Sequence, residues 1–313
     1  MGILDSDLEE MFARSGEGTG VFPFDVQPKK ITEKEFTSFQ QLIHHISGIW
    51  LPPAKATLLV GRLLKRLRIR GFSSFDEYYG AVTSEPEELT EMLNAISTNE
   101  TRFFREPLQF EFLEQRILPQ WKADGKSGKR SRRIRVWSAG CSTGQEPYSL
   151  AMLLLHHLPP SDGWEIEIIA TDLSTQALET AMDATWEIAK ASEISDRYLK
   201  AFMLKGYGEQ EGRLKAGPEI RQLVHFFHLN LNDQAYFISG KFDLIFCRNV
   251  LIYFNVETRT QIVRRLLQFL LPEGYLFAGH AESLHTMCGE LRAVMPTIYN
   301  HARRPGQQAN AHR

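Results

Sequence analysis

The sequence has little cysteine and no long apolar run. Its three cysteines are Cys141, Cys247 and Cys288, and no two of them have the spacing of a zinc site or a redox motif. A small, odd number of cysteines speaks against a disulfide framework and favours a reducing compartment. The acidic amino-terminal stretch lacks the apolar core of a signal peptide, and no apolar run reaches the roughly 20 residues of a membrane span. We therefore expect a soluble, cytoplasmic protein with no membrane insertion and no metal site.

An excess of positive charge is also missing. The chain has 36 basic and 38 acidic residues, and its net charge of −2 speaks against a nucleic-acid partner. Apolar residues make up 43% and charged residues 24% of the 313 residues, which is ordinary for a globular protein with a buried core. This length suits about two domains.

The first third of the chain has the periodicity of helices. We expect residues 1–30 to form a flexible tail and residues 31–105 to form an all-α domain. Apolar residues recur three and four positions apart, as on one face of a helix: Phe36, Phe39, Leu42, Ile43 and Ile46. Three capping-box patterns predict helix starts: Thr32-x-x-Glu35, Ser74-x-x-Glu77 and Ser84-x-x-Glu87. Residues 106–133 are predicted to connect two domains, with a helix to about Trp121 and a basic, solvated linker at 122–133.

From residue 134 onward, strand-like and helix-like segments alternate. The stretches IRVWSA, EIEIIATD and FDLIFCRN are predicted strands with helices between them, which indicates a parallel α/β sheet. We expect this domain to cover residues 134–300, with a small antiparallel β-hairpin insertion near 205–225 and a flexible tail at 301–313.

A glycine-bearing turn joins the first predicted strand to its helix in VWSAGCSTGQEPYSLAM, residues 136–152. It lacks the lysine of a Walker phosphate loop and the middle glycine of the dinucleotide fingerprint. Glu146 at the helix start would repel a pyrophosphate, although a helix N-terminus otherwise attracts anions. The turn therefore favours a ligand that offers positive charge and hydrogen-bond donors.

S-adenosylmethionine has an ammonium group, a sulfonium and ribose hydroxyls, and so meets this description. Asp172 follows the second predicted strand, and Arg248 and Asn249 follow FDLIFC. Ligands of open α/β sheets bind at such carboxyl ends. Taken singly, Asp172 could instead cap a helix, and Arg248–Asn249 could be a loop pair. Their recurrence at successive strand ends predicts a Rossmann-like, class I S-adenosylmethionine-dependent methyltransferase.

Four stretches together resemble the CheR-type chemotaxis receptor methyltransferases: STNETRFFREP, VWSAGCSTGQEPYSLAM, ATDLSTQALETA and FDLIFCRNVLIYF. The resemblance covers roughly residues 30–300. It implies a protein-glutamate O-methyltransferase that esterifies glutamate side chains on chemoreceptor helices for sensory adaptation. The cofactor S-adenosyl-L-methionine would leave as S-adenosyl-L-homocysteine.

The resemblance also implies a set of cofactor-binding residues. Residues of the TNETRFFR segment would close over the cofactor, acids would hold its amino and ribose ends, and other residues would flank the adenine and the methionine part. These residues are Asn99, Thr101, Arg105, Gly140, Glu146, Asp172, Asn230, Leu231, Arg248 and Asn249. The chain departs from many relatives at Gln145, where a second glutamate is common, and at Ala281, where a serine is common.

A glutamate acceptor, with an ordinary pKa of about 4.3, is already an anion at neutral pH and needs no general base. The enzyme must align the reactants and remove water. Arg248 and Tyr253 are the candidate catalytic residues, since Arg248 could guide the acceptor carboxylate and Tyr253 could line the methyl site. The run RNVLIYF lacks the prolines with which nucleic-acid methyltransferases grip an amine.

Acidic residues are absent between Phe36 and Ser74. Five basic residues there are predicted to bind the acidic receptor helices: Lys55, Arg62, Lys65, Arg66 and Arg70. A merely solvated face is the alternative. The insertion KGYGEQEGRLK resembles a loop that tethers a receptor's C-terminal peptide, although its spacing alone indicates only a hairpin. The sequence leaves open two other functions, a non-catalytic S-adenosylmethionine-binding signalling adaptor and a methyltransferase of nucleic acids or small molecules. We expect a monomer.

Overall fold

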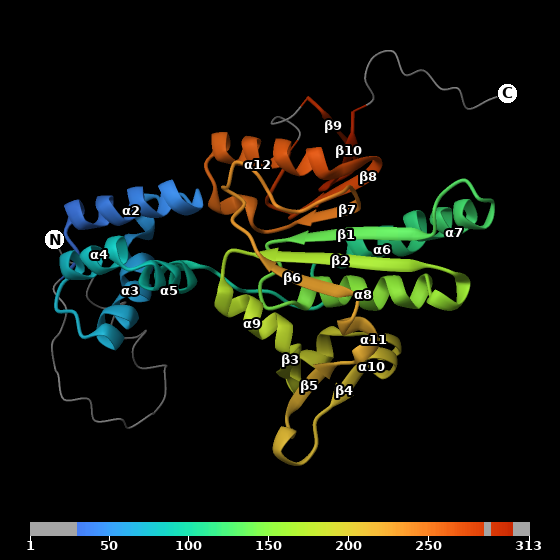
Figure 1. Cartoon of the computed structure of the whole chain (residues 1–313), viewed down its shortest axis with the longest axis horizontal. Helices are drawn as coiled ribbons and strands as arrows, with labels where there is room; N and C mark the ends of the chain where they lie inside the picture. The colour runs from blue at the N-terminus through green and yellow to red at the C-terminus, as the bar shows by residue number, and fades with distance from the viewer. Residues whose placement is uncertain (1–29, 285–288, 303–313) are drawn as a thin grey trace.

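The computed structural model describes residues 30–284 and 289–302, which form a helical domain followed by an α/β domain (Figure 1). The tails expected at 1–30 and 301–313 lie almost wholly outside these residues. None of the helices in the described ranges has both the length and the apolar character needed to cross a membrane.

The helical domain contains α2 (Glu33–Ser47), α3 (Ala56–Arg70), α4 (Phe75–Ser84) and α5 (Pro86–Ile96), with a short 3-10 turn at Pro53–Lys55. Its core is apolar and largely aromatic on one side, where Phe39 packs against Phe75, Tyr78 and Tyr79. The apolar spacing predicted from the sequence therefore faces this core, as expected for amphipathic helices.

The three capping-box patterns have different outcomes. Thr32 forms the complete box, since its backbone N–H donates to Glu35 Oε2 at 2.7 Å and its hydroxyl accepts from the Glu35 N–H at 3.2 Å. Ser74 also caps its helix, but the Glu77 carboxylate accepts from the Ser73 backbone instead. The prediction for Ser84 is wrong. It is the last residue of α4, where its hydroxyl donates to a carbonyl of that helix, and Pro86 begins the next one.

The connection between the domains is more helical and better packed than its composition indicates. It contains α6 (Pro107–Phe112), a π-helical turn (Leu113–Ile117) and α7 (Leu118–Lys126). The predicted solvated linker therefore begins five residues too early. Arg130 forms an ion pair with Asp243 at 2.5 Å and lies over the Trp121 ring, so this basic residue is anchored to the sheet domain.

A seven-stranded sheet organises the second domain, in the order β6-β2-β1-β7-β8-β10-β9. Its strands are β1 (Arg133–Ala139), β2 (Glu165–Asp172), β6 (Val224–His228), β7 (Phe242–Cys247), β8 (Leu270–Ala278), β9 (Leu291–Met295) and β10 (Ile298–His301). The first five in spatial order are parallel, and β10 is antiparallel to both of its neighbours. The last two strands were not predicted, because they are short and β9 has no continuous apolar run.

Helices cover both faces of this sheet (Figure 1). The core on one face includes residues of α6, α7 and α8 (Gln145–His157). The other face packs against α12 (Val256–Phe269). The buried Trp137 belongs to the α12 side, while its neighbour Val136 belongs to the α8 side, as the alternation of a strand requires.

The insertion is a three-stranded antiparallel sheet in the order β3-β5-β4. Its strands are β3 (Thr185–Glu187), β4 (Met203–Lys205) and β5 (Arg213–Ala216), with α10 (Asp196–Phe202) before β4 and α11 (Pro218–Arg221) after β5. The expected hairpin is β4–β5, but the third strand begins well before residue 205. The insertion also ends earlier than expected, because Val224 already belongs to the main sheet.

The carboxyl ends of β1, β2 and β7 face the helical domain (Figure 1). The two domains are joined by polar contacts across this edge. Asn230 Nδ2 donates to the Ile46 carbonyl at 2.7 Å, and the Trp50 N–H donates to the Tyr253 carbonyl at 2.8 Å. The edge of the sheet where ligands usually bind is therefore covered by helices.

Candidate active site

A cavity of about 310 Å³ lies between the helical domain and the carboxyl ends of β1, β2 and β7. All ten residues predicted to bind the cofactor line it, although they come from five separate segments of the chain. These are Asn99, Thr101, Arg105, Gly140, Glu146, Asp172, Asn230, Leu231, Arg248 and Asn249. Tyr253, Lys55 and Arg62 also line the cavity, whereas Lys65, Arg66 and Arg70 do not.

The turn after β1 brings the backbone close to the cavity. The N–H groups of Gly140 and Cys141 both donate to the Thr171 carbonyl, at 2.7 and 2.9 Å. Gly140 has a φ of 82°, and a Cβ there would lie 2.3 Å from Cγ2 of Val250. Glycine is therefore required both by the left-handed backbone and by the space.

Asp172 is held by backbone donors on both of its oxygens. The Ser142 N–H donates to Oδ2 at 2.7 Å, and the Ser174 N–H donates to Oδ1 at 2.9 Å. Burial raises the pKa of Asp172, and these backbone hydrogen bonds oppose that rise. The helix cap of α9 (Thr175–Asp183) is Ser174, not Asp172, because the Ser174 hydroxyl accepts from the Ala177 N–H. Each oxygen keeps a lone pair that can accept a ligand hydroxyl.

Glu146 and Arg248 meet at the first turn of α8. The Ser138 hydroxyl donates to Glu146 Oε1 at 2.7 Å, and Glu146 Oε2 lies 3.5 Å from Arg248 Nε. Burial raises the pKa of Glu146, while the Arg248 charge opposes that rise. Glu146, which is predicted to bind a positively charged ligand group, is thus already next to the positive charge of Arg248.

Arg248 is 6% exposed and lies between two carboxylates. Its Nε is 3.5 Å from Glu146 Oε2 and 3.8 Å from Glu106 Oε2, and its Nη2 donates to the Arg105 carbonyl at 2.5 Å. The Nε and Nη1 donors have no hydrogen-bond partner, and neither has Glu106 Oε2. Buried donors without partners carry a desolvation cost, so these atoms are suited to a polar ligand group.

Two glutamates that contact cavity-lining residues, without lining the cavity themselves, were not found from the sequence. Glu106 precedes α6 with a φ of 61°, and its Oε1 accepts from the His280 N–H at 3.2 Å. Glu282 is fully buried and accepts from the N–H groups of Gly279, Asn249 and Ile252, at 2.6, 2.9 and 3.1 Å. Burial raises the pKa of Glu282. Both lie in loops, where no periodicity distinguishes a buried carboxylate from a solvated one.

Asn249 adopts the left-handed conformation, with a φ of 60°. Its side chain donates to Glu106 Oε1 at 3.4 Å, and its N–H donates to Glu282 Oε2. The loop after β7 is therefore tied to the loop after β8. The Glu282 carboxylate, which directly follows Ala281, makes this connection.

The segment 97–105 crosses from the helical domain onto the sheet. The Asn99 carbonyl accepts from the Ser142 hydroxyl at 3.0 Å, and Arg105 Nη1 donates to the Glu100 carbonyl at 3.1 Å. Phe103 packs edge-on against Trp186, and Phe104 stacks on Tyr198. These two phenylalanines anchor the segment from outside the cavity, so Thr101 and Arg105 stay at its wall.

Asn230, which is predicted to flank the adenine, uses its side chain between the domains. Its Nδ2 donates to the Ile46 carbonyl and its Oδ1 accepts from the Asn232 N–H at 2.9 Å. Leu231 is buried in the core beside α12 and lines the cavity. Asn230 can therefore flank a ligand only with atoms that these hydrogen bonds leave available.

The five basic residues predicted to bind acidic receptor helices do not form one uniform basic face. Arg66 forms ion pairs with Glu88 and Glu91, and Arg70 forms ion pairs with Glu85 and Glu88. Arg66 and Arg70 are therefore already paired within the helical domain, with Glu85 and two acids of α5, and their role in binding receptor helices stays a prediction.

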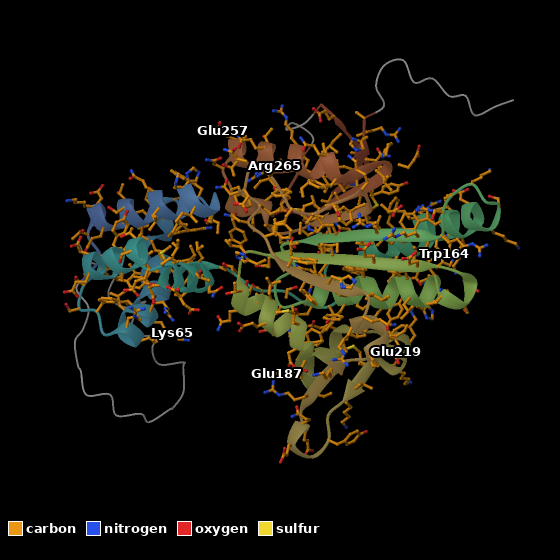
Figure 2. The ribbon with its side chains drawn as sticks, viewed as in Figure 1. Lys65, Trp164, Glu187, Glu219, Glu257 and Arg265 are labelled. Atoms are coloured by element: carbon orange, nitrogen blue, oxygen red, sulfur yellow. The ribbon has the colours of Figure 1, made fainter. Side chains whose placement is uncertain are left out.

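The other three basic residues differ from one another. Arg62 donates to the Ile96 carbonyl and to the Thr98 hydroxyl, and so clamps the segment that leads into the cavity. Lys55 Nζ lies 5.8 Å from the centre of the Tyr253 ring at the cavity wall. Lys65 is exposed on the outer surface of the helical domain (Figure 2).

The cavity fits S-adenosylmethionine. The glycine turn leaves room for a close ligand, Glu146 and Asp172 suit its ammonium group and ribose hydroxyls, and the free donors of Arg248 suit its carboxylate. Within the described residues, no cluster of histidine, cysteine and acidic side chains could hold a metal ion. Cys141 is unsuited to act as a nucleophile here, since burial raises the pKa of its thiol well above the ordinary value.

The sheet order and this cavity define a class I S-adenosylmethionine-dependent methyltransferase with an added helical domain. The chain belongs to the CheR methyltransferase family. The family model "CheR methyltransferase, SAM binding domain" matches residues 99–299, and "CheR methyltransferase, all-alpha domain" matches residues 34–97.

Similar proteins match over nearly their whole length. Chemotaxis protein methyltransferase 2 of Pseudomonas aeruginosa is 36% identical over 279 residues, which cover 89% of this chain and 97% of that protein. The chemotaxis protein methyltransferases of Escherichia coli and Salmonella typhimurium are 36% and 34% identical over 272 residues. These matches cover 86% of this chain and 91% and 90% of the respective relatives. The predicted family, enzyme class and cofactor are confirmed.

Proposed function

We propose that the chain methylates glutamate side chains of chemoreceptors, giving glutamate methyl esters and S-adenosylhomocysteine for sensory adaptation. The observation that carries this proposal is the placement of Lys55 and Arg62. Both come from the helical domain, and both line the same cavity as the cofactor acids Glu146 and Asp172. Cations at the acceptor side of the cavity suit an anionic acceptor and would repel a cationic one.

The groups around the cavity suit an acceptor that needs no deprotonation. Among the described residues that line it there is no histidine, and the Cys141 thiol has a raised pKa. A glutamate with its ordinary pKa of about 4.3 is ionised at neutral pH. The protein's contribution is then alignment of the acceptor and exclusion of water, and bound S-adenosylmethionine supplies an electrophilic methyl group.

Arg248 and Tyr253 remain our candidates for orienting the reactants. Arg248 is fixed by the Arg105 carbonyl and by Glu146, and two of its donors are free. Tyr253 is held through its backbone, which accepts from the Trp50 N–H, and its ring faces Lys55. We propose that Lys55 and Tyr253 border the path by which the acceptor carboxylate reaches the cofactor.

The mouth of the cavity also has apolar side chains. Leu58 from α3 and Ile252 from the loop after β7 line it and are 45% and 41% exposed. A receptor helix that presents both glutamate and apolar side chains would match this mixture of cationic and apolar groups. Arg66 and Arg70 are not part of this proposal, because α5 neutralises them.

We further propose that a receptor's C-terminal peptide adds to the small sheet at β4. This strand lies at an edge of that sheet, and Leu204 within it and Tyr207 just after it are 52% and 79% exposed. An extended peptide can pair with such an edge. Calorimetric titration of candidate receptor tail peptides tests this, and the absence of binding by every tail would contradict it.

The main test incubates the protein with methyl-labelled S-adenosylmethionine and receptor cytoplasmic domains. We expect label on the receptor that mild base releases as methanol, because the product is a carboxyl ester. Label that resists base, or transfer to nucleic acid but not to receptor, would contradict the proposal. We also propose that the protein acts as a cytoplasmic monomer, which light scattering of the purified enzyme can check.

A further inference from the structure

Asn94 lies in the last turn of α5, in the helical domain, yet its side chain contacts the sheet domain. It is 7% exposed. Its Oδ1 accepts from the Ser174 hydroxyl at 3.0 Å, from the Thr175 hydroxyl at 3.3 Å and from the Gln176 N–H at 3.4 Å. Its Nδ2 donates to Thr175 Oγ1 at 3.0 Å. A buried amide is costly unless its polar atoms are paired, and this one is paired across the domain boundary.

These contacts fix the residues that follow the Asp172 carboxylate. Ser174 caps α9 with its hydroxyl oxygen, and it gives the hydroxyl proton to Asn94. The N–H of the same Ser174 donates to Asp172 Oδ1. Between them, Leu173 packs against the core of the helical domain. The segment from Asp172 to Gln176 is therefore clamped by another domain.

A second chain of hydrogen bonds leads from Asp172 back to the segment that follows α5. Asp172 Oδ2 accepts from the Ser142 N–H at 2.7 Å, and the Ser142 hydroxyl donates to the Asn99 carbonyl at 3.0 Å. Asn99 lies only five residues after Asn94 in the sequence. A closed circuit thus runs from α5 through the Asp172 carboxylate and back to the segment that follows α5.

We propose that Asn94 is a positioning residue of the cofactor site, which acts through Ser174 to aim the Asp172 carboxylate at the ribose. The helical domain then completes the cofactor site in addition to receiving the acceptor. This inference rests on the assignment of Asp172 to the cofactor, and it does not depend on which acceptor is methylated. The acceptor's identity can fail without affecting it.

The test measures S-adenosylhomocysteine affinity by calorimetry, with the full chain and no acceptor. Asn94→Leu keeps the side-chain volume but removes both polar ends, and we expect about tenfold weaker binding. Asn94→Asp keeps the accepting oxygen, and we expect its affinity to stay within about threefold of the native value. Asn232→Leu is the matched control, because Asn232 also bridges the domains, to His45 and Ile46, without contacting Asp172. Its affinity is expected to be unchanged.

A double-mutant cycle separates positioning from general destabilisation. If Asn94 acts through Asp172, Asn94→Leu should add almost no loss to an Asp172→Asn variant. Native affinity of a folded Asn94→Leu protein, equal losses in the Leu and Asp variants, or fully additive losses with Asp172→Asn would each overturn the proposal. If Asn94→Leu does not fold, Ser174→Ala replaces it in the same cycle, since it breaks the same link from the other side.

Discussion

Arg66 of α3 forms a bidentate ion pair with Glu88 of α5, in which Nη2 donates to Oε2 at 2.8 Å and Nε donates to Oε1 at 3.0 Å. Glu88 is almost completely buried and also accepts from Arg70 and from the Tyr78 hydroxyl. One carboxylate thus joins three side chains of the helical domain. This arrangement makes part of an apparently basic helix a structural element of its own domain.

Removal of this carboxylate should destabilise the helical domain. We expect Glu88→Ala to lower the free energy of unfolding by about 3 kcal/mol, because it leaves the buried Tyr78 hydroxyl without its acceptor and removes the buried carboxylate that Arg66 and Arg70 share. Glu91→Ala is the control, since Glu91 is half exposed and its pair with Arg66 should contribute less than about 1 kcal/mol. Urea unfolding of both variants checks this, and equal losses would contradict it.

The same pair should depend on pH in the acid range. Burial alone would raise the pKa of Glu88, but hydrogen bonds from Arg66 and Tyr78 outweigh it, so the pKa lies below the ordinary value. Its stabilising contribution is therefore complete above the ordinary glutamate pKa of about 4.3 and is lost as pH falls through the lower native pKa. The stability difference between native protein and Glu88→Ala should shrink in that range. A constant difference throughout acid unfolding would count against the ion pair.

Lys65 and Arg62 should respond differently to charge reversal. Lys65→Glu is expected to lower the receptor methylation rate about threefold to tenfold at low salt, with unchanged S-adenosylhomocysteine affinity, because it reverses an exposed charge that would attract an acidic acceptor without touching the cavity. Arg62→Glu is expected to weaken both, since Arg62 also holds the Ile96–Thr98 segment next to Asn99. Lys122→Glu on α7, at the far end of the sheet, is the matched control (Figure 1). A Lys65 variant with the native salt dependence of methylation would exclude its role.

Gly140 should tolerate no side chain unless Val250 is shortened. Gly140→Ala adds a Cβ 2.3 Å from Val250 Cγ2 at a φ of 82°, and we expect at least about tenfold weaker cofactor binding. Gly140→Ala combined with Val250→Ala should recover part of this loss, because only the backbone strain then remains. Gly61→Ala is the control, since nothing lies within 4 Å of its added Cβ. Calorimetry with S-adenosylhomocysteine distinguishes these cases, and no recovery in the double variant would show that the contact with Val250 is unimportant.

As pH falls, cofactor affinity should begin to decline at a higher pH than it would if the binding carboxylates were exposed. Burial raises the pKa of both Glu146 and Asp172, and the ligand's ammonium and hydroxyl groups require the ionised forms. Affinity should therefore decline as pH falls through these raised values, by at most about tenfold per pH unit for each carboxylate. Titrations at several pH values check this, and Glu146→Gln should show a shallower decline.

These two carboxylates affect stability in the opposite direction. Because their native pKa values are raised, their contribution to the stability of the ligand-free protein is complete below the ordinary carboxyl pKa of about 4. It is lost as pH rises through the raised values. A cofactor affinity that stayed constant as pH fell to the ordinary carboxyl pKa of about 4 would contradict the raised pKa values of Glu146 and Asp172.

The alternation of strands and helices after residue 134 was predictable because each strand-like run is apolar over a length that suits a buried strand. The strands IRVWSA and FDLIFC became β1 and β7 of the central sheet. The strands β9 and β10 were missed, since only tertiary pairing distinguishes such short segments from loops. The place of Asp172, Arg248 and Asn249 at the cavity was also predicted, because polar residues at the carboxyl ends of parallel strands must converge at one edge. The other cavity-lining residues on the helical side and after β6 were expected only from the family resemblance: Asn99, Thr101, Arg105, Asn230 and Leu231.

The sequence by itself determined the class of fold and the cofactor. The glycine turn, Glu146 and Asp172 each stand at the end of a strand or the start of a helix, and these places can be read from the local order of residues. Only the tertiary structure decided which charges are free. Arg66 and Arg70 meet acids supplied by α5, and Asn94 meets a helix start some 80 positions further along the chain. Such pairings depend on which distant segments pack together, and electrostatic and hydrogen-bond energies depend on those distances in space, which the linear order does not specify.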